Sequence, residues 1–132
     1  MVNIPEEVLK AMSEQTTVKA LVTADASGQP HAIVCGSIVA PAPDKVIVGE
    51  VLMKKSSKNL DANKKGAILV SSGMTAYEII VTNPVRIAEG PALDQMNEKL
   101  AAVHLKANAL WMFDVAAVYD QSASPKAGTQ LA

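Results

Sequence analysis

The segment Leu52–Leu60, with the sequence LMKKSSKNL, carries the residues of this chain best suited to bind an anion. It follows a predicted strand over residues 45–49 and opens a predicted short helix. Five of the twelve basic residues fall between Lys54 and Lys65, so positive charge is concentrated here. Ammonium groups, hydroxyls and the free N–H groups of a helix N-terminus together suit the phosphate of a mononucleotide. The alternative interpretation is a solvated, lysine-rich helix face.

The composition predicts one folded domain over residues 1–132, with 49% apolar residues to fill a core. A net charge of −1 and few aromatic residues (one Trp, one Phe and two Tyr) argue against a nucleic-acid partner. The single cysteine, Cys35, allows no intrachain disulfide, and one Cys and two His residues far apart argue against a structural zinc site. The sequence shows no signal peptide and no membrane-spanning run, so we expect a cytoplasmic protein.

Hydrophobic periodicity predicts six or seven strands, two substantial helices and one short helix. The predicted strands span residues 18–24, 30–39, 45–49, 67–71, 76–82, 85–88 and 109–119, the last with Trp111, Phe113, Val115 and Ala117 on one face. The first predicted helix spans residues 5–15. The second runs from a cap at Ser56 or Ser57 to about Asn63, and Gly66 ends that unit. The third is indicated by an apolar stripe of Leu93, Met96, Leu100 and Val103.

Turn residues predict how these elements connect. Asp25–Gly28 favours a tight turn, and Asn83-Pro84 favours a bulge or an edge within a strand. Hairpins outnumber strand–helix–strand units, which predicts a mainly β, α+β fold: an antiparallel barrel with flanking helices. Residues 122–132 form a polar, turn-rich tail.

The order of several short motifs resembles the FMN-binding split barrel of the pyridoxamine-phosphate-oxidase-like superfamily, and in layout its small, dimeric FMN-binding proteins. The resemblance extends from Pro5 to about Tyr119 and rests on order and spacing, because each motif is short. The motifs are Pro5-Glu6-Glu7-Val8, Leu21-Val22-Thr23-Ala24-Asp25, Gly28-Gln29-Pro30-His31, Gly36-Ser37, Lys55-Ser56 with Asn59-Leu60, and Val85-Arg86-Ile87-Ala88-Glu89-Gly90.

The resemblance implies FMN as cofactor, bound at the interface of a homodimer. Lys55 and Ser56 match the family's phosphate-binding pair, with Lys54 and Lys58 as alternatives, and Asn59 matches the residue that supports this loop. The segment Val34, Cys35, Gly36 and Ser37 is expected to pass along the cofactor. The segment Val48, Gly49, Glu50 and Val51 is expected to meet the polar edge of the flavin through its backbone, with Gly49 allowing close approach.

The chain also departs from the family pattern. Tryptophans near the flavin in the small family members are replaced here by Val34 or Cys35 and by Leu105, and Trp111 is either a substitute or a core residue. Arg86 is the only arginine and no His follows His104, so the pyridoxamine phosphate oxidase reaction itself is not expected. Cys35 is expected to be an inert core thiol, and Glu50 to be either a rim residue or a polar neighbour of the cofactor.

These observations predict an FMN-binding flavoprotein that acts as an oxidoreductase or electron-transfer protein, with no catalytic side chain and no metal. The redox partner is not specified by the sequence. A small barrel is filled by its own side chains, so the cofactor is expected between two subunits. Leu131 in the tail is expected either to cover the partner's flavin or to be frayed. Alternatives are a non-catalytic FMN carrier, the same fold with a deazaflavin or haem, and a structural dimer without cofactor.

Overall fold

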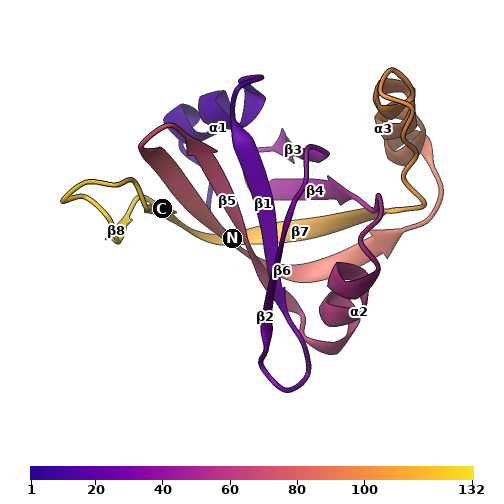
Figure 1. Cartoon of the computed structure of the whole chain (residues 1–132), viewed down its shortest axis with the longest axis horizontal. Helices are drawn as coiled ribbons and strands as arrows, with labels where there is room; N and C mark the ends of the chain where they lie inside the picture. The colour runs from indigo at the N-terminus through magenta and orange to yellow at the C-terminus, as the bar shows by residue number, and fades with distance from the viewer.

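Eight antiparallel strands form the body of the protein in the computed structural model, which describes all 132 residues (Figure 1). The strands are β1 (Val18–Ala24), β2 (Pro30–Val34), β3 (Ile38–Ala42), β4 (Lys45–Gly49), β5 (Lys65–Ser72), β6 (Thr75–Ile87), β7 (Leu110–Asp120) and β8 (Thr129–Gln130). The helices are α1 (Glu6–Ser13), α2 (Lys54–Ala62) and α3 (Pro91–Ala101). The strand order is β2-β1-β5-β6-β7-β4-β3, with β8 paired to β7. The predicted antiparallel α+β class is confirmed.

The connection between β2 and β3 shows that this sheet must curl. The backbone N–H of Cys35 still bonds to Lys19 beside β2, and Gly49 N–H already bonds to Ser37 beside β3. Yet β2 and β3 are the opposite edges of the strand order, about 29 Å apart if the sheet were flat. The four Cα steps from Val34 to Ile38 cover at most about 15 Å. The sheet is therefore wrapped into a barrel, as a split barrel requires.

The predicted single strand over residues 30–39 is wrong, because residues 35–37 form a turn that divides it into β2 and β3. The apolar run continues through this turn, since Cys35 and Ser37 are both buried, so periodicity alone gives no sign of a break. By contrast, the bounds of β1 and β4 agree with the prediction. The Asp25–Gly28 turn is also confirmed, with Gly28 at a φ of 90°.

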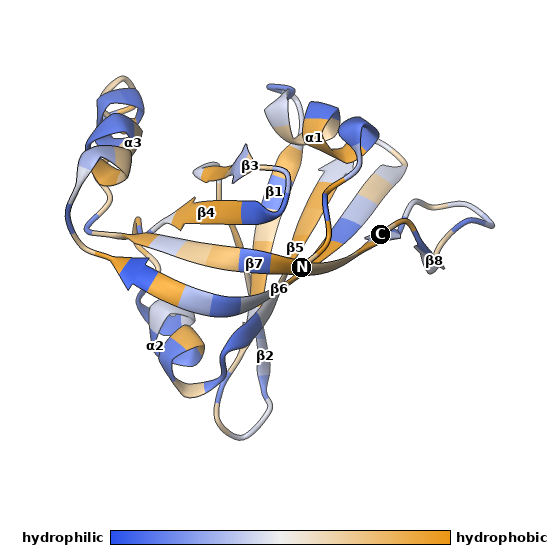
Figure 2. Ribbon diagram, turned by 180° about the vertical axis from the view of Figure 1, so that it is seen from behind, coloured by the Kyte–Doolittle hydropathy of each residue, from blue (hydrophilic) through white to orange (hydrophobic).

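The core occupies the inside of the barrel and is closed by helices at its two ends. Leu21, Ile68, Ile79 and Val118 lie side by side across β1, β5, β6 and β7, and all are fully buried. Helix α1 lies at one end and α2 at the other (Figure 1). Val8 and Met12 of α1 and Leu60 of α2 join the same core. In Figure 2, β4 is apolar along almost its whole length, in accord with four buried residues in succession.

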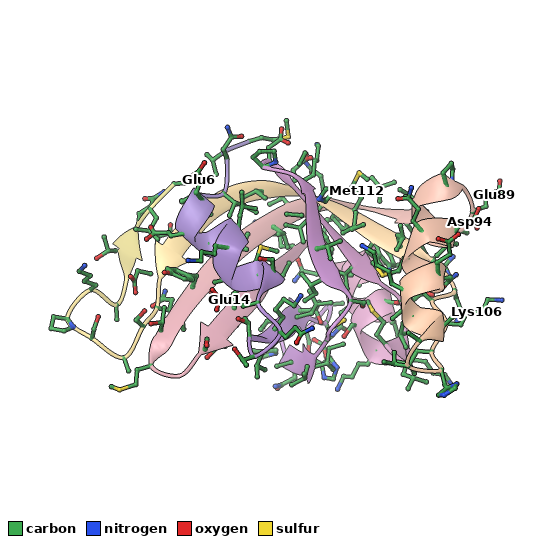
Figure 3. The ribbon with its side chains drawn as sticks, turned by 90° about the horizontal axis from the view of Figure 1, so that it is seen from above. Glu6, Glu14, Glu89, Asp94, Lys106 and Met112 are labelled. Carbon is green, nitrogen blue, oxygen red and sulfur yellow. The ribbon has the colours of Figure 1, made fainter.

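Helix α3 stands apart from the barrel, beyond the ends of β6 and β7 (Figures 1 and 2). Leu93 and Met96 pack with Ile47 and Leu110 in a second, smaller core. Figure 3 shows Glu89, Asp94 and Lys106 on the side of α3 that faces away from the barrel. Val103 follows the helix and is 61% exposed, so the prediction that it shares the helix's buried stripe is wrong.

Two bulges set which residues of β6 and β7 face the core. The pairing of β6 with β7 shifts at Asn83-Pro84, as predicted, and Asn83 adopts a φ of 52°. A second shift lies between Ile80, which pairs with Ala117, and Val81, which pairs with Val115. Val118 therefore takes the buried position that the sequence assigned to Ala117.

Helix α2 begins earlier than its hydroxyl residues suggested. Met53 is its N-cap, and no side chain caps the first turn. Ser56 and Ser57 lie inside the helix, so the predicted serine cap is wrong. Gly66 does not end the unit but pairs within β5, where an added Cβ would lie 3.0 Å from the Val22 carbonyl oxygen. Close contact between strands, and not helix termination, therefore requires this glycine.

The polar tail folds back onto its own chain. Leu131 N–H bonds to the Val118 carbonyl at 2.7 Å, and Val118 N–H bonds to the Ala132 carbonyl at 2.9 Å. The side chains of Leu131 and Ala132 pack against the main core. Leu131 is thus held by its own subunit, which opposes both expected roles, a frayed end and a cover for the partner's flavin. None of the three helices is long and apolar enough to cross a membrane.

Candidate functional site

A cavity of ≈500 Å³ lies where the β2–β3 turn, the loop after β4 and the residues after α3 meet. Eight of its ten lining residues are hydrophobic, and none carries a charge. We call it the apolar pocket; its lining consists of Ile33, Val34, Cys35, Gly36, Ser37, Val51, Leu52, Leu100, Val103 and Leu105. Its volume and character are those of small-molecule sites. The structure thus brings together five of the predicted cofactor residues, Val34 to Ser37 and Val51.

The wall formed by the residues after α3 was only partly expected. Leu105 was named from the family pattern, together with Val34 and Cys35, and all three now line one cavity. Val103 was expected on the helix stripe. The turn that follows α3 closes at His104, which has a φ of 58°, and Leu105 N–H bonds back to the Leu100 carbonyl. This tight ending directs Val103 and Leu105 to the pocket, and no local sequence pattern announces it.

Ser37 and Gly49 fit closely against each other beneath the pocket. The Ser37 hydroxyl donates to the Gly49 carbonyl oxygen at 3.1 Å, and the Cys35 sulfur lies 3.1 Å from the same hydroxyl. A Cβ on Gly49 would lie 3.1 Å from the Ser37 side chain. In this structure, Gly49 therefore makes room for Ser37, not for a planar ring. Cys35 is buried and bonded to Ser37, consistent with a core thiol that also lines the pocket.

The end of β4 presents fewer free backbone donors than the family pattern implies. The N–H groups of Gly49, Glu50 and Val51 bond to the carbonyls of Ser37, Ala109 and Gly49. Val48 is fully buried in the core and lines neither the apolar pocket nor its neighbour. The N–H groups of residues 49–51 are thus used within the chain, and Val51 is the one residue of the predicted segment 48–51 whose side chain lies at the apolar pocket.

Glu50 is the centre of a hydrogen-bonding cluster that joins four elements. Its carboxylate accepts bonds from Arg86 at 3.1 and 2.8 Å, from the Ser57 hydroxyl at 2.7 Å and from the Trp111 indole N–H at 3.0 Å. The Arg86 bonds, followed by those from Ser57 and Trp111, lower the pKa of Glu50 from 4.5 to about 2. Trp111 is therefore a core residue with a structural hydrogen bond, and does not replace the family's tryptophans beside a flavin.

A smaller cavity of ≈190 Å³, here called the side pocket, adjoins the apolar pocket and shares Leu52 with it. Glu50, Lys54 and Ser57 give it polar walls, so it connects the apolar pocket to the first turn of α2. Lys54 is exposed, and its ammonium is the only lysine group among the residues that line the side pocket. The first turn of any helix also leaves its N–H groups without intrahelical acceptors.

Ser56 and Asn59 lie on the buried side of α2. The Ser56 hydroxyl is fully covered and has no hydrogen-bond partner. Asn59 donates to the Thr23 hydroxyl at 3.1 Å, which ties α2 to β1, the supporting role that the sequence implied. Lys55 lies toward the β1–β2 turn, where Asp25 has a pKa lowered by Ser27 and Gln29 and, to a smaller extent, by Lys55. Neither Lys55 nor Ser56 lines the apolar pocket or the side pocket.

Solved structures with this arrangement of strands and helices decide the fold. HupZ from Group A Streptococcus matches with a TM-score of 0.79 and 18% identity, covering 95% of this chain and 99% of that one. The chain has the split-barrel fold of the pyridoxamine-phosphate-oxidase-like proteins. This confirms the fold that the sequence resemblance implied, and no family model and no curated protein matches.

Two further split barrels are similar. An FMN-binding protein from Syntrophomonas wolfei matches with a TM-score of 0.74 and 17% identity, covering 89% of this chain and 84% of that one. A putative pyridoxamine 5'-phosphate oxidase from Lactobacillus delbrueckii matches with a TM-score of 0.72 and 18% identity, covering 89% and 93%. The same fold also occurs in an F420 reductase and in HutZ, the haem storage protein from Vibrio cholerae. The split barrel therefore accommodates several cofactors, and the choice among them depends on the site.

Proposed function

We propose that this split barrel binds FMN, with the flavin ring in the apolar pocket and the phosphate at the first turn of α2. The observation that carries the proposal is the junction of an uncharged pocket of ≈500 Å³ with a basic helix start, through the side pocket. An aromatic ring suits the first environment and a phosphate suits the second. Such a pair of environments, with one ligand spanning both, matches a mononucleotide better than an uncharged molecule.

The residues present fit a phosphate at this place. Lys54 and Lys55 supply positive charge, and the first-turn N–H groups supply oriented donors. The buried Ser56 hydroxyl has no partner in the chain, and a phosphate oxygen would give it one. Because this oxygen is covered, the phosphate would reach it only if the first turn shifts, whereas the lysines and the N–H groups act without such a shift.

FMN, when bound, would supply the redox chemistry, and the chain would supply binding, orientation and exclusion of water. The lining of the apolar pocket contains no acid, base or charged group that would take part in proton transfer. We therefore propose an oxidoreductase or electron-transfer role without a catalytic side chain. A non-catalytic carrier would bind FMN equally well but would not exchange electrons with added donors and acceptors.

The lining also distinguishes FMN from haem. Haem iron in proteins takes an axial ligand from His, Met, Cys or Tyr. Among the ten residues of the apolar pocket, Cys35 is the only one of these types, and it is buried beside Ser37. A deazaflavin shares the ring shape and the phosphate of FMN, so the visible spectrum and the mass of the released cofactor must separate these two.

Substitutions at the first turn of α2 test the phosphate seat. The variants to compare are Lys54→Ala, Lys55→Ala and Lys55→Ala/Ser56→Ala. Where the altered group contacts phosphate, the affinity for FMN should fall by about tenfold or more, since a charge-assisted bond contributes about 1.5–3 kcal/mol. Riboflavin has no phosphate, so its affinity should remain unchanged. Fluorescence titration of both ligands measures the difference, with Lys64→Ala as a control from the same basic segment. Equal losses for FMN and riboflavin in every variant would contradict the phosphate role.

The outer face of the sheet supports a homodimer. Neighbouring residues in register on β1, β2, β5 and β6 give this face an apolar surface opposite the buried face that carries Leu21. Its apolar residues are Ala20, Val22, Ala32, Val34, Ala67, Leu69 and Ile80, and Glu78 lies beside Leu69 on the same face. Extended apolar faces of this kind mark interaction sites. Val34 belongs both to this face and to the apolar pocket, so a second copy placed here would border the cofactor.

Val22→Lys tests this interface, because its neighbours in register, Ala32 and Ala67, offer no carboxylate, and an unpaired ammonium buried between subunits is strongly unfavourable. We expect a dimeric mass for the wild type at micromolar concentration and a dissociation constant at least about tenfold higher for the variant. Met74→Lys is the matched control, since Met74 is an exposed apolar residue at the β5–β6 turn, outside the face. Analytical ultracentrifugation gives both masses. A wild-type monomer that binds FMN would rule out the dimeric site.

A further inference from the structure

Leu52 combines two features that its own chain does not explain. Its φ is 53°, in the left-handed region that L-residues with bulky side chains rarely adopt. The residue is 92% exposed, more than any other large hydrophobic residue of the chain. An exposed leucine alone is common, but here the backbone is held in an unfavourable conformation while the side chain gains no contact from it. Such strain is typical of residues held in place for a ligand.

The neighbours of Leu52 show how the strain is maintained. On one side, Glu50 pairs with the segment before β7 through Glu50 N–H to Ala109 and Asn108 N–H to Glu50, at 2.8 and 3.1 Å. On the other side, Met53 is buried in the main core at the start of α2. Both ends of the short loop that carries Leu52 are therefore anchored, which holds Leu52 in the left-handed region.

The position of Leu52 indicates what the strain is for. It is the one residue that lines both the apolar pocket and the side pocket, and therefore stands at the boundary between them. A ligand with its ring in the first pocket and its phosphate beyond the second must pass this side chain. Leu52 is thus placed to cover one face of the ring and to keep water in the side pocket away from that face.

We infer that Leu52 is a ring-packing residue: its side chain is held out by the strained loop to pack against the flavin. This inference rests on the proposed function and extends it, because it assigns the ring contact to a residue that neither composition nor periodicity marks. It has two consequences, and the first of them is not shared by a purely structural role. Removal of the side chain should weaken binding of the flavin ring, whether or not the ligand carries a phosphate. Relief of the strain should stabilise the empty protein.

Leu52→Ala and Leu52→Gly separate these two consequences. Alanine removes the contact and keeps the strain, whereas glycine removes both, because it adopts a positive φ freely. Both variants should lower the affinities for riboflavin and FMN by the same factor, about fivefold or more. Both should also shift the visible absorption bands of the bound flavin. Without ligand, Leu52→Gly should melt at a higher temperature than Leu52→Ala. Val85→Ala is the matched control, since Val85 is 58% exposed and lines neither pocket, and it should bind both ligands as the wild type does.

The outcomes distinguish this inference from the proposed function. A wild-type protein that binds neither riboflavin nor FMN would refute the proposed function. A wild-type protein that binds both, with Leu52 variants that bind riboflavin equally well, would refute the ring contact alone. Variants that dissociate the dimer while riboflavin affinity is unchanged would also overturn it, because Leu52 would then contact the second subunit.

Discussion

Glu50→Ala is expected to destabilise the fold by about 2–4 kcal/mol, since hydrogen bonds to charged groups contribute about 1.5–3 kcal/mol each and several are lost together. The Glu50 side chain is only 12% exposed and holds Arg86, Ser57 and Trp111. Its removal leaves the Trp111 indole N–H without its carboxylate acceptor inside the core. Urea denaturation of the two proteins, with the midpoint and slope compared, measures the change.

Arg86→Ala is the matched control for this substitution. The Arg86 side chain is 43% exposed, so the cost of removing it is limited to the bonds that the Glu50 carboxylate loses. Glu50 would still accept bonds from Ser57 and Trp111. We expect a loss of about 1 kcal/mol, in the range of partly solvated ion pairs. A larger loss for Arg86→Ala than for Glu50→Ala would show that the carboxylate is not the centre of the cluster.

The same cluster predicts a dependence of stability on pH. The pKa of Glu50 is lowered from 4.5 to about 2 by folding, so the folded state favours the ionised form. This contribution is fully present above about pH 4.5 and is lost as the pH falls toward 2. Solvent at the exposed Arg86 side chain screens this pair, so the stabilisation is smaller than the roughly 3 kcal/mol that the shift alone would give. Glu50→Gln should therefore lose less stability than the wild type between pH 5 and pH 2, measured by thermal melts at fixed ionic strength; parallel curves would exclude the assignment.

Much of the fold follows from local pattern. β1 and β4 have the predicted bounds because alternation and turn residues define both ends of each strand. The antiparallel class follows from the excess of hairpins over crossovers. The division of residues 30–39 could not be predicted, because the apolar run continues through the turn at residues 35–37. β2 pairs with β1 and β3 pairs with β4 as two local hairpins, and the wrapping of the sheet requires the turn that separates them.

The candidate site was predictable where the chain itself brings residues together. The segments 34–37 and 48–51 were named from sequence, and Val34 to Ser37 and Val51 now share one pocket. The Glu50 cluster was not predictable, because Arg86 and Trp111 are 36 and 61 residues away along the chain. The serine cap failed because the helix begins at Lys54 and places Ser56 and Ser57 inside it. The Ser57 hydroxyl bonds to the distant Glu50, and the buried Ser56 hydroxyl has no partner.

Truncation after Tyr119 is expected to destabilise the protein by about 2–3 kcal/mol, because the tail completes the free edge of β7. Three backbone bonds join Val118 to Leu131 and Ala132, and each contributes about 0.5–1.5 kcal/mol. The Leu131 side chain adds buried apolar area against the main core. The conformational entropy regained by the deleted residues offsets part of this sum.

Truncation after Pro125 separates the two expected roles of the tail. It keeps Ser122, whose hydroxyl bonds with the backbone of Ala76, but removes Leu131 and Ala132. If Leu131 acts by packing on its own core, both truncated proteins should lose similar stability, and Leu131→Ala alone should lose about 1 kcal/mol. Riboflavin affinity, measured where each protein is still a folded dimer, should be unchanged. Full stability with weakened riboflavin binding would instead place Leu131 at a partner's flavin and contradict the packing seen in this structure.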